Sequence, residues 1–135
     1  MARGPRAAIS FGIVACAYAI LLLLAMWIPE VRAIELGRGE TGLDKLLHAT
    51  AFLVLAVLLS ASFTRLPARG TSPATLAATL FVGISYGVVH EALQSVLPAF
   101  AFNPADAYAN VTGVVLGALL YHGSAWVWSA LGGPA

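Results

Sequence analysis

Four long apolar stretches limit what this chain can fold into. They cover about residues 7–28, 46–63, 74–97 and 106–131, and nearly all ionisable side chains lie outside them. At about 1.5 Å per helical residue, each stretch is long enough to cross the ~30 Å hydrocarbon core of a bilayer. The stretches therefore predict an all-α polytopic membrane protein, with four transmembrane helices in a compact bundle that forms one domain over residues 1–135.

The composition agrees with a membrane environment. Hydrophobic residues make up 60% of the chain and charged residues 10%, whereas soluble domains average ~45–50% and ~25%. The net charge of +1 gives no basic surface for nucleic acid, so the lipid bilayer is the expected partner. Cys16 is the single cysteine, which excludes an internal disulfide framework and a cysteine-based zinc site.

The first stretch could also be a processed leader. It follows Arg3 and Arg6, as the core of a secretory signal peptide would. However, its apolar run of about 20 residues exceeds the ~7–15 residues of a signal peptide core. Residues 13–16 resemble a lipoprotein cleavage site, but cleavage there would leave most of the apolar run after the cysteine. We therefore expect this stretch to be retained as a helix.

Basic residues predict the orientation of the chain. Arg3 and Arg6 precede the first stretch, and Arg65 and Arg69 lie in a turn without acids between the second and third stretches. The segment between the third and fourth stretches has no lysine or arginine, and the first loop mixes basic with acidic residues. Because cytoplasmic loops carry an excess of positive charge, we expect both termini and the arginine turn in the cytoplasm.

Polar residues gather at the stretch ends that this orientation places on the outer side. His48 would lie about 6 Å deeper than Asp44, and Asn110 about 6 Å deeper than Asp106. Glu91 reaches the same level near the end of the third stretch. Because polar groups inside lipid are costly, a cluster drawn from three helices predicts a functional site. The expected polar pocket comprises Asp44, Lys45, His48, Glu91, Gln94, Asp106 and Asn110.

Two of the polar rows continue into glycines at helical spacing. Such spacing keeps residues on one helix face, and glycines four apart let transmembrane helices approach closely. We expect the third and fourth helices to pack through these rows and to hold the polar groups against the second helix. The helix-packing residues predicted in this way are Gly83, Gly87, Gly113 and Gly117.

Most members of the pocket also have a purely structural interpretation. Asp44 can stabilise the start of its helix through the helix dipole, and His48 can bond to Asp44 one turn back. Amides such as Asn110 and Gln94 commonly join helices in membranes. Glu91 is the hardest to explain in this way, because an ionised carboxylate inside lipid needs a partner or a proton.

The other two histidines are expected to lie apart from the pocket. His90 points about 100° away from Glu91 around the helix, since each helical residue turns the chain by that angle. We expect it to contact the first helix or Tyr86. His122 is expected near the inner membrane interface.

Three segments resemble the VanZ-like membrane proteins, a family named for a protein associated with teicoplanin resistance. Residues 44–52 resemble its "DKxxHxxxF" helix start, residues 91–94 followed by Pro98 its "ExxQ…P" helix end, and residues 106–113 its "DxxxNxxG" helix start. The resemblance covers about residues 43–120. Where the family usually has a Pro-Gly-Arg turn, this chain has Pro98, Ala99 and Phe100.

The resemblance implies a multi-pass protein of the bacterial cytoplasmic membrane that binds a lipid-linked or amphipathic envelope component. The implied process is envelope homeostasis or glycopeptide tolerance. Glu91 and Asp106 would accept hydrogen bonds from the ligand, Gln94 and Asn110 would fix the geometry, and His48 would donate. No cofactor and no metal ion is expected, and the oligomeric state stays open.

Three other functions stay open. A histidine beside two carboxylates suits an intramembrane enzyme using acid–base or metal-assisted chemistry, although no activated nucleophile is evident. A structural or interaction protein without a ligand site would use the polar layer only to specify packing. A proton-coupled transporter is less favoured, because the inner half of the helices is expected to lack a polar lining.

Overall fold

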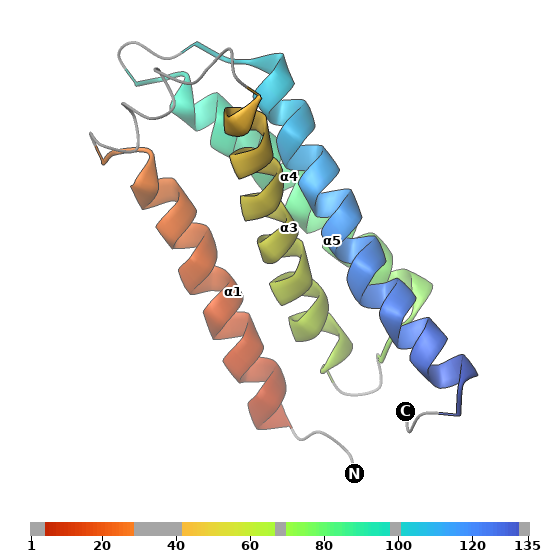
Figure 1. Ribbon diagram of the computed structural model, residues 1–135. Coiled ribbons are helices and arrows are strands. Elements are labelled where there is room, and N and C mark those ends of the chain that lie inside the picture. The colour runs from red at the N-terminus through yellow and green to blue at the C-terminus, as the bar shows by residue number, and fades with distance from the viewer. Residues whose placement is uncertain (1–4, 29–41, 67–69, 98–100, 133–135) are drawn as a thin grey trace.

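The part of the chain that the structure describes forms a bundle of four helices. The computed structural model describes residues 5–28, 42–66, 70–97 and 101–132. Its helices are α1 (Pro5–Ala25), α3 (Leu43–Thr64), α4 (Pro73–Gln94) and α5 (Pro104–Ala130), and they run alternately in opposite directions (Figure 1). We call the end where α3 and α5 begin and α4 ends the polar end. The all-α class and the bundle predicted from the sequence are confirmed for the described residues.

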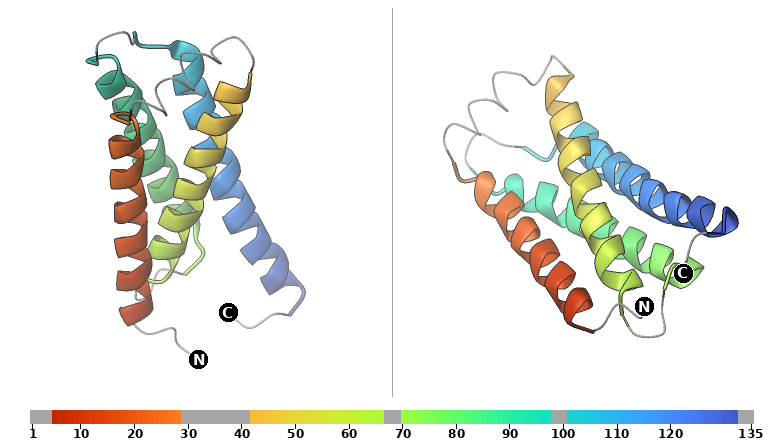
Figure 2. Two further views of the ribbon diagram at one scale, coloured as in Figure 1. Left: turned by 60° about the vertical axis from the view of Figure 1, so that its left-hand side comes forward. Right: turned by 60° about the horizontal axis from the view of Figure 1, so that its bottom comes forward.

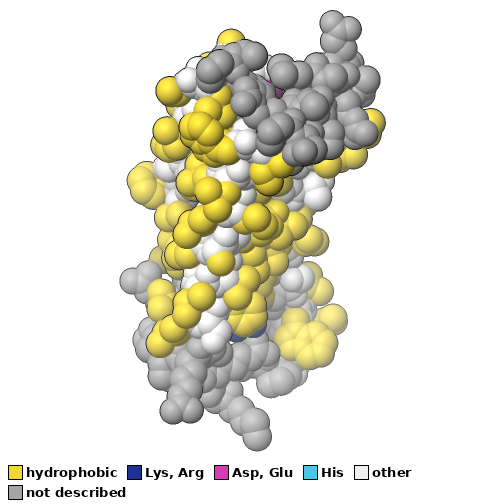
Figure 3. Space-filling view, turned by 90° about the vertical axis from the view of Figure 1, so that its left-hand side faces the viewer, with side chains coloured by type: hydrophobic (Ala, Val, Ile, Leu, Met, Phe, Trp, Pro, Cys, Tyr) yellow, Lys and Arg dark blue, Asp and Glu magenta, His cyan; other side chains and the backbone are white. Residues whose placement is uncertain are grey.

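The helices present apolar surfaces suited to a bilayer. Three of them, α3, α4 and α5, are long and apolar enough to cross a membrane. Large hydrophobic side chains face outward along the bundle, and they cover much of the face that carries α1 (Figure 3). Such extensive apolar exposure marks a surface made for lipid or another apolar partner. The described apolar part of α1, Ile9–Ala25, is shorter, so the fourth span stays a prediction.

Local sequence sets the helix ends that form the polar end. α3 begins at Leu43, earlier than predicted, because Gly42 takes a left-handed conformation (φ 72°) that turns the chain into the helix. α5 begins at Pro104, where proline suits the first helical position and the Asn103 side chain accepts a hydrogen bond from the amide of Ala105. These starts place Asp44 and Asp106 in the first turns of their helices.

The end of α4 differs from the prediction. The helix ends at Gln94 rather than near residue 97. The amides of Val96 and Leu97 bond to carbonyls only three residues back, which tightens the chain out of the α-helix. The other end of α4 starts with a capping box, in which Ser72 and Thr75 satisfy each other's backbone amides.

Helix α3 occupies the centre of the bundle. It contacts α1, α4 and α5, and it lies between α1 and α5 in Figure 1 and in the right-hand view of Figure 2. Its Phe52, Leu55 and Ala56 form the buried core with Val114 of α5. This apolar core fills the middle of the bundle and separates two layers of buried polar residues, one at each end.

The glycine rows pack helices, but not against each other as predicted. A side-chain carbon added at Gly83 would meet Val114 of α5. Carbons added at Gly113 and Gly117 would instead overlap the backbone carbonyls of Ala49 and Leu53 in α3. The α4 glycines therefore accommodate α5 side chains, whereas the α5 glycines bring the α5 backbone against α3. The sequence places glycines on one face but does not say which neighbour that face meets.

A second polar layer lies in the other half of the bundle, where the sequence led us to expect almost none. Ser60, Thr75, Thr79 and His122 are all fully buried there. The Ser60 hydroxyl donates to Thr79 Oγ1 at 3.3 Å, and Thr79 donates to the Thr75 carbonyl at 3.0 Å. Hydroxyl side chains carry no charge, so they do not stand out in an apolar sequence. Polar residues therefore line the bundle near both ends.

His122 is buried inside the bundle, packed edge-on against Tyr121 and Trp126. Neither ring nitrogen has a hydrogen-bond partner among the described residues.

Arg65 connects three helices at this end of the bundle. Its guanidinium donates to the Tyr121 hydroxyl and lies 4.0 Å from the centre of the Phe11 ring, so one cation joins α1, α3 and α5.

Candidate functional site

Lys45 is the central cation of the polar end. Its ammonium group donates to Asp44 Oδ2 at 2.6 Å and to Asp106 Oδ1. The two aspartate side chains are only 7% and 12% exposed, whereas Lys45 is 30% exposed. A lysine that snorkels in this way keeps contact with the aqueous side while its charge holds two nearly buried carboxylates. The sequence predicts Lys45 in the pocket but does not indicate that it bridges α3 and α5.

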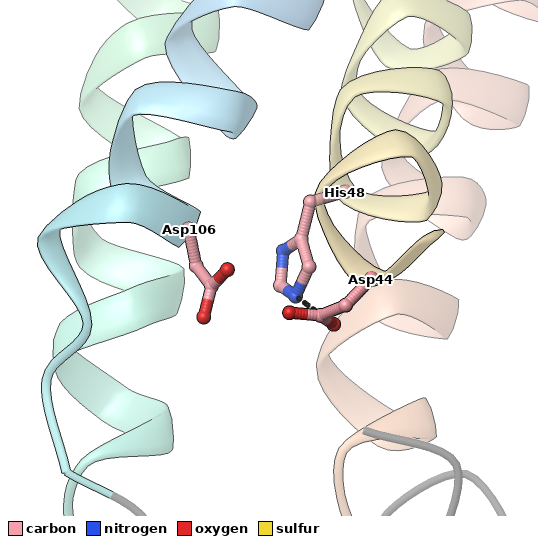
Figure 4. Close-up of side chains that lie close together, drawn as sticks. All are labelled: Asp44, His48 and Asp106. Atoms are coloured by element: carbon pink, nitrogen blue, oxygen red, sulfur yellow. Dashed lines mark ion pairs between the residues drawn. The ribbon is translucent and has the colours of Figure 1, made fainter. Parts of the chain in front are cut away.

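His48 and Asn110 form the layer below. The ring nitrogen Nδ1 of His48 lies 2.9 Å from the Asn110 side-chain oxygen, and the Asn110 amide group donates to the Gly87 carbonyl at 3.3 Å. His48 Nε2 lies 3.6 Å from Asp44 Oδ1, and Figure 4 shows the imidazole and both aspartates turned toward one another. Asn110 therefore joins all three helices, with no exposed surface.

Glu91 lies inside the bundle and not against lipid. It is 2% exposed, and its Oε1 accepts a hydrogen bond from the Asn103 amide at 2.9 Å. Its second oxygen, Oε2, has no hydrogen-bond partner in the described part of the chain. Glu91 is close enough to Asp106, His48 and Lys45 to interact with them electrostatically. The structure therefore places Glu91 in the layer that holds the other ionisable groups.

Gln94 is also buried at the polar end, one turn after Glu91 on α4. The structure therefore brings every residue of the predicted pocket to one end of the bundle. Asn103, whose amide donates to Glu91, was not predicted as part of the cluster. Its position directly before Pro104 is the signal in the sequence, since Asn followed by Pro is typical of a helix start.

His90 lies beside this cluster and binds α1. Its Nε2 is 3.3 Å from the Leu22 carbonyl, and its ring packs edge-on against Phe52 with 5.6 Å between centroids. Tyr86 on the same helix donates to the Ala19 carbonyl. The prediction that His90 serves the first helix is confirmed, and these polar contacts attach α1 to the rest of the bundle.

Among the described residues, carboxyl groups outnumber ammonium groups in the cluster. Asp44 and Asp106 both pair with the ammonium of Lys45, and Glu91 is buried in the same layer. The cluster can therefore accept hydrogen bonds or hold a further cation. Asp44, His48 and Asp106 could together hold a metal ion, since one potential ligand atom from each lies within 4.8 Å of the others.

An apolar cavity opens at the same end of the bundle, between α1 and α4. Its volume is about 400 Å³, which lies within the range of ligand sites. Met26 and Leu97 are buried beside it, whereas Trp27 and Val96 are largely exposed. The complete lining is Leu23, Met26, Trp27, Leu93, Val96 and Leu97.

Comparisons with models of protein families, with curated proteins and with solved structures found no match. The resemblance to the VanZ-like proteins rests on the three sequence segments alone.

Proposed function

We propose that this chain is a VanZ-like membrane protein that binds a lipid-linked or amphipathic component of the bacterial cell envelope. The observation that supports this proposal most strongly is that acidic, amide and imidazole groups from α3, α4 and α5 meet at one end of the bundle. Burying ionisable side chains inside a membrane costs free energy, so a cluster of them is interpreted first as a functional site.

The chemistry of the cluster favours a ligand that donates hydrogen bonds. Carboxylates outnumber the lysine, and Glu91 Oε2 has no partner among the described residues. Hydroxyl, amide or ammonium groups would be bound by Glu91 and Asp106, while Asn110 and Gln94 would fix the geometry. Lys45, the most exposed member, stands where such a group would enter.

The apolar cavity at the same end supports an amphipathic ligand. A head group at the polar cluster and a hydrocarbon segment between α1 and α4 would use both features. The arginine bias in the sequence favours an outward orientation for this end, where envelope precursors are handled. The bacterial cytoplasmic membrane and the role in glycopeptide tolerance come from the resemblance and belong to this proposal.

Survival of a bacterial host in teicoplanin tests the proposal. We expect expression of the chain to raise survival, and Glu91→Gln to abolish the gain at equal membrane abundance. Thr112→Ala is the matched control, because Thr112 is exposed and bonds only to its own helix. No gain from the unaltered chain, or a full gain from Glu91→Gln, would contradict the proposal.

A structural role is the second candidate, and the internal pairing of the cluster favours it. Lys45, His48 and Asn110 already bond to protein partners on neighbouring helices. If the cluster only holds the helices together, Glu91→Gln, Asp106→Asn and Asn110→Ala will all lower abundance together. Loss of survival at normal abundance separates a ligand site from this alternative.

A further inference from the structure

Asp44, His48 and Asp106 bring three potential metal ligands together from two helices. One carboxylate oxygen from each aspartate and a ring nitrogen of His48 lie within 4.8 Å of one another (Figure 4). Counted as whole residues, backbone included, all three are less than 10% exposed. The ammonium of Lys45 lies between the two aspartates, so a metal ion bound by all three ligands would take its place.

The hydrogen bonds of Asn110 fix which nitrogen of His48 carries the proton. The Asn110 amide nitrogen donates to the Gly87 carbonyl, and the reversed amide would place two oxygen acceptors against each other. The Asn110 oxygen therefore faces His48 and accepts from Nδ1–H. The other ring nitrogen, Nε2, lies 3.6 Å from Asp44 Oδ1, so a metal ion between these two atoms would be bound by both.

Glu91 lies in the same polar layer. Its exposed fraction is 2%, its Oε1 accepts a hydrogen bond from the Asn103 amide, and Oε2 has no hydrogen-bond partner among the described residues. Among those residues, Asp44 and Asp106 share one ammonium, that of Lys45. A metal ion at this position would therefore meet two carboxylates and one histidine ring.

We propose that Asp44, His48 and Asp106 bind a divalent first-row transition-metal ion, with zinc as the representative. One imidazole and two carboxylates form an N/O donor set of the kind that zinc and its neighbours accept. Asn110 holds His48 as metal-binding histidines are usually held, through the other ring nitrogen. This site goes beyond the proposed function and does not depend on it.

Lys45 acts as the internal competitor of the metal ion. Its ammonium occupies the position between the two aspartates. Its flexible stem and 30% exposure let it turn toward the aqueous side when an ion arrives. Removing this charge therefore strengthens metal binding, whereas a merely structural ion pair would show no such gain.

Zinc affinity of the purified full-length protein in detergent tests the site, by competition with a chromogenic chelator and by elemental analysis after dialysis. We expect Lys45→Gln to tighten zinc binding about tenfold or more, since a like charge is removed from direct contact. His48→Gln is expected to weaken binding by about a hundredfold, and Asn110→Ala by about tenfold, the range found for residues that orient a ligand.

His90→Gln is the matched control, since His90 lies at the same end but bonds to α1. It should leave zinc affinity unchanged. Equal affinity in the unaltered protein and His48→Gln would overturn the site, as would the absence of zinc binding by both the unaltered protein and Lys45→Gln. Because Lys45→Gln is predicted to gain affinity, a loss through misfolding cannot imitate the expected result.

Discussion

Lys45 and Asp106 lie 61 positions apart in the sequence and are directly paired in the structure, each in the first turn of its helix. This pair fixes the start of α3 against the start of α5. Below it, His48 and Asn110 repeat the same connection one turn deeper. The polar cluster is therefore the contact that sets how these two helices align.

A double-mutant cycle measures this pair. Lys45→Gln and Asp106→Asn should each lower the free energy of unfolding in detergent by about 1–3 kcal/mol, because each leaves a partly buried charge without its partner. The double variant should lose less than the sum, with a coupling energy of about 1–2 kcal/mol. Simple additivity of the two losses would mean that the pair contributes nothing to stability.

Asn110→Ala should destabilise the bundle by about 2 kcal/mol. It removes the acceptor of His48 and the donor to Gly87, leaving buried polar groups unsatisfied. Unfolding by a denaturing detergent, followed by circular dichroism, gives the measurement. Thr112→Ala, two residues away on the exposed face, should stay within about 0.5 kcal/mol of the unaltered protein. Equal effects from both variants would contradict the structure.

The α5 glycines offer a test of packing. Gly113→Ala places a carbon against the Ala49 carbonyl of α3, which is backbone and cannot turn aside, so we expect a loss of about 1–3 kcal/mol. Gly123 has open space around its added carbon. There the same substitution should stabilise the helix by about 0.5–1 kcal/mol. Thermal unfolding of the two variants side by side shows whether the signs differ as predicted.

His122→Phe should stabilise the protein or leave it unchanged. Both ring nitrogens of His122 are buried without partners among the described residues, and its surroundings include the rings of Tyr121 and Trp126. Replacing an unsatisfied polar ring with an apolar ring of similar shape recovers about 1–2 kcal/mol. A marked loss of stability would show that the nitrogens have a bound partner, such as water.

The sequence predicts the helices and the polar end well, because both depend on local rules. Apolar length sets the spans, and the order of the spans places Asp44, Glu91 and Asp106 at one level. The pairing of individual side chains depends on which helix faces meet. That is why the bridge made by Lys45 was not predicted, nor the contact of Gly113 with α3.

The buried layer around Ser60 and Thr79 escaped prediction for a different reason. Serine and threonine bond to nearby carbonyls and hydroxyls, so they occur in apolar helices without any charge to mark them. The position of His122 inside the bundle likewise follows from the α5 face that meets its neighbours. A single histidine in an apolar stretch does not reveal its depth.

Site-directed cross-linking tests the central claim most directly. In a Cys16→Ser background, a pair of cysteines at positions 44 and 106 should be joined by a short bifunctional maleimide, because those side chains face each other across the polar end. A pair at positions 44 and 124 should not, since position 124 lies about 27 Å further along α5. Efficient linking of 44 to 106 alone is the predicted result. Linking of neither pair, with each cysteine reacting singly, would contradict the arrangement described.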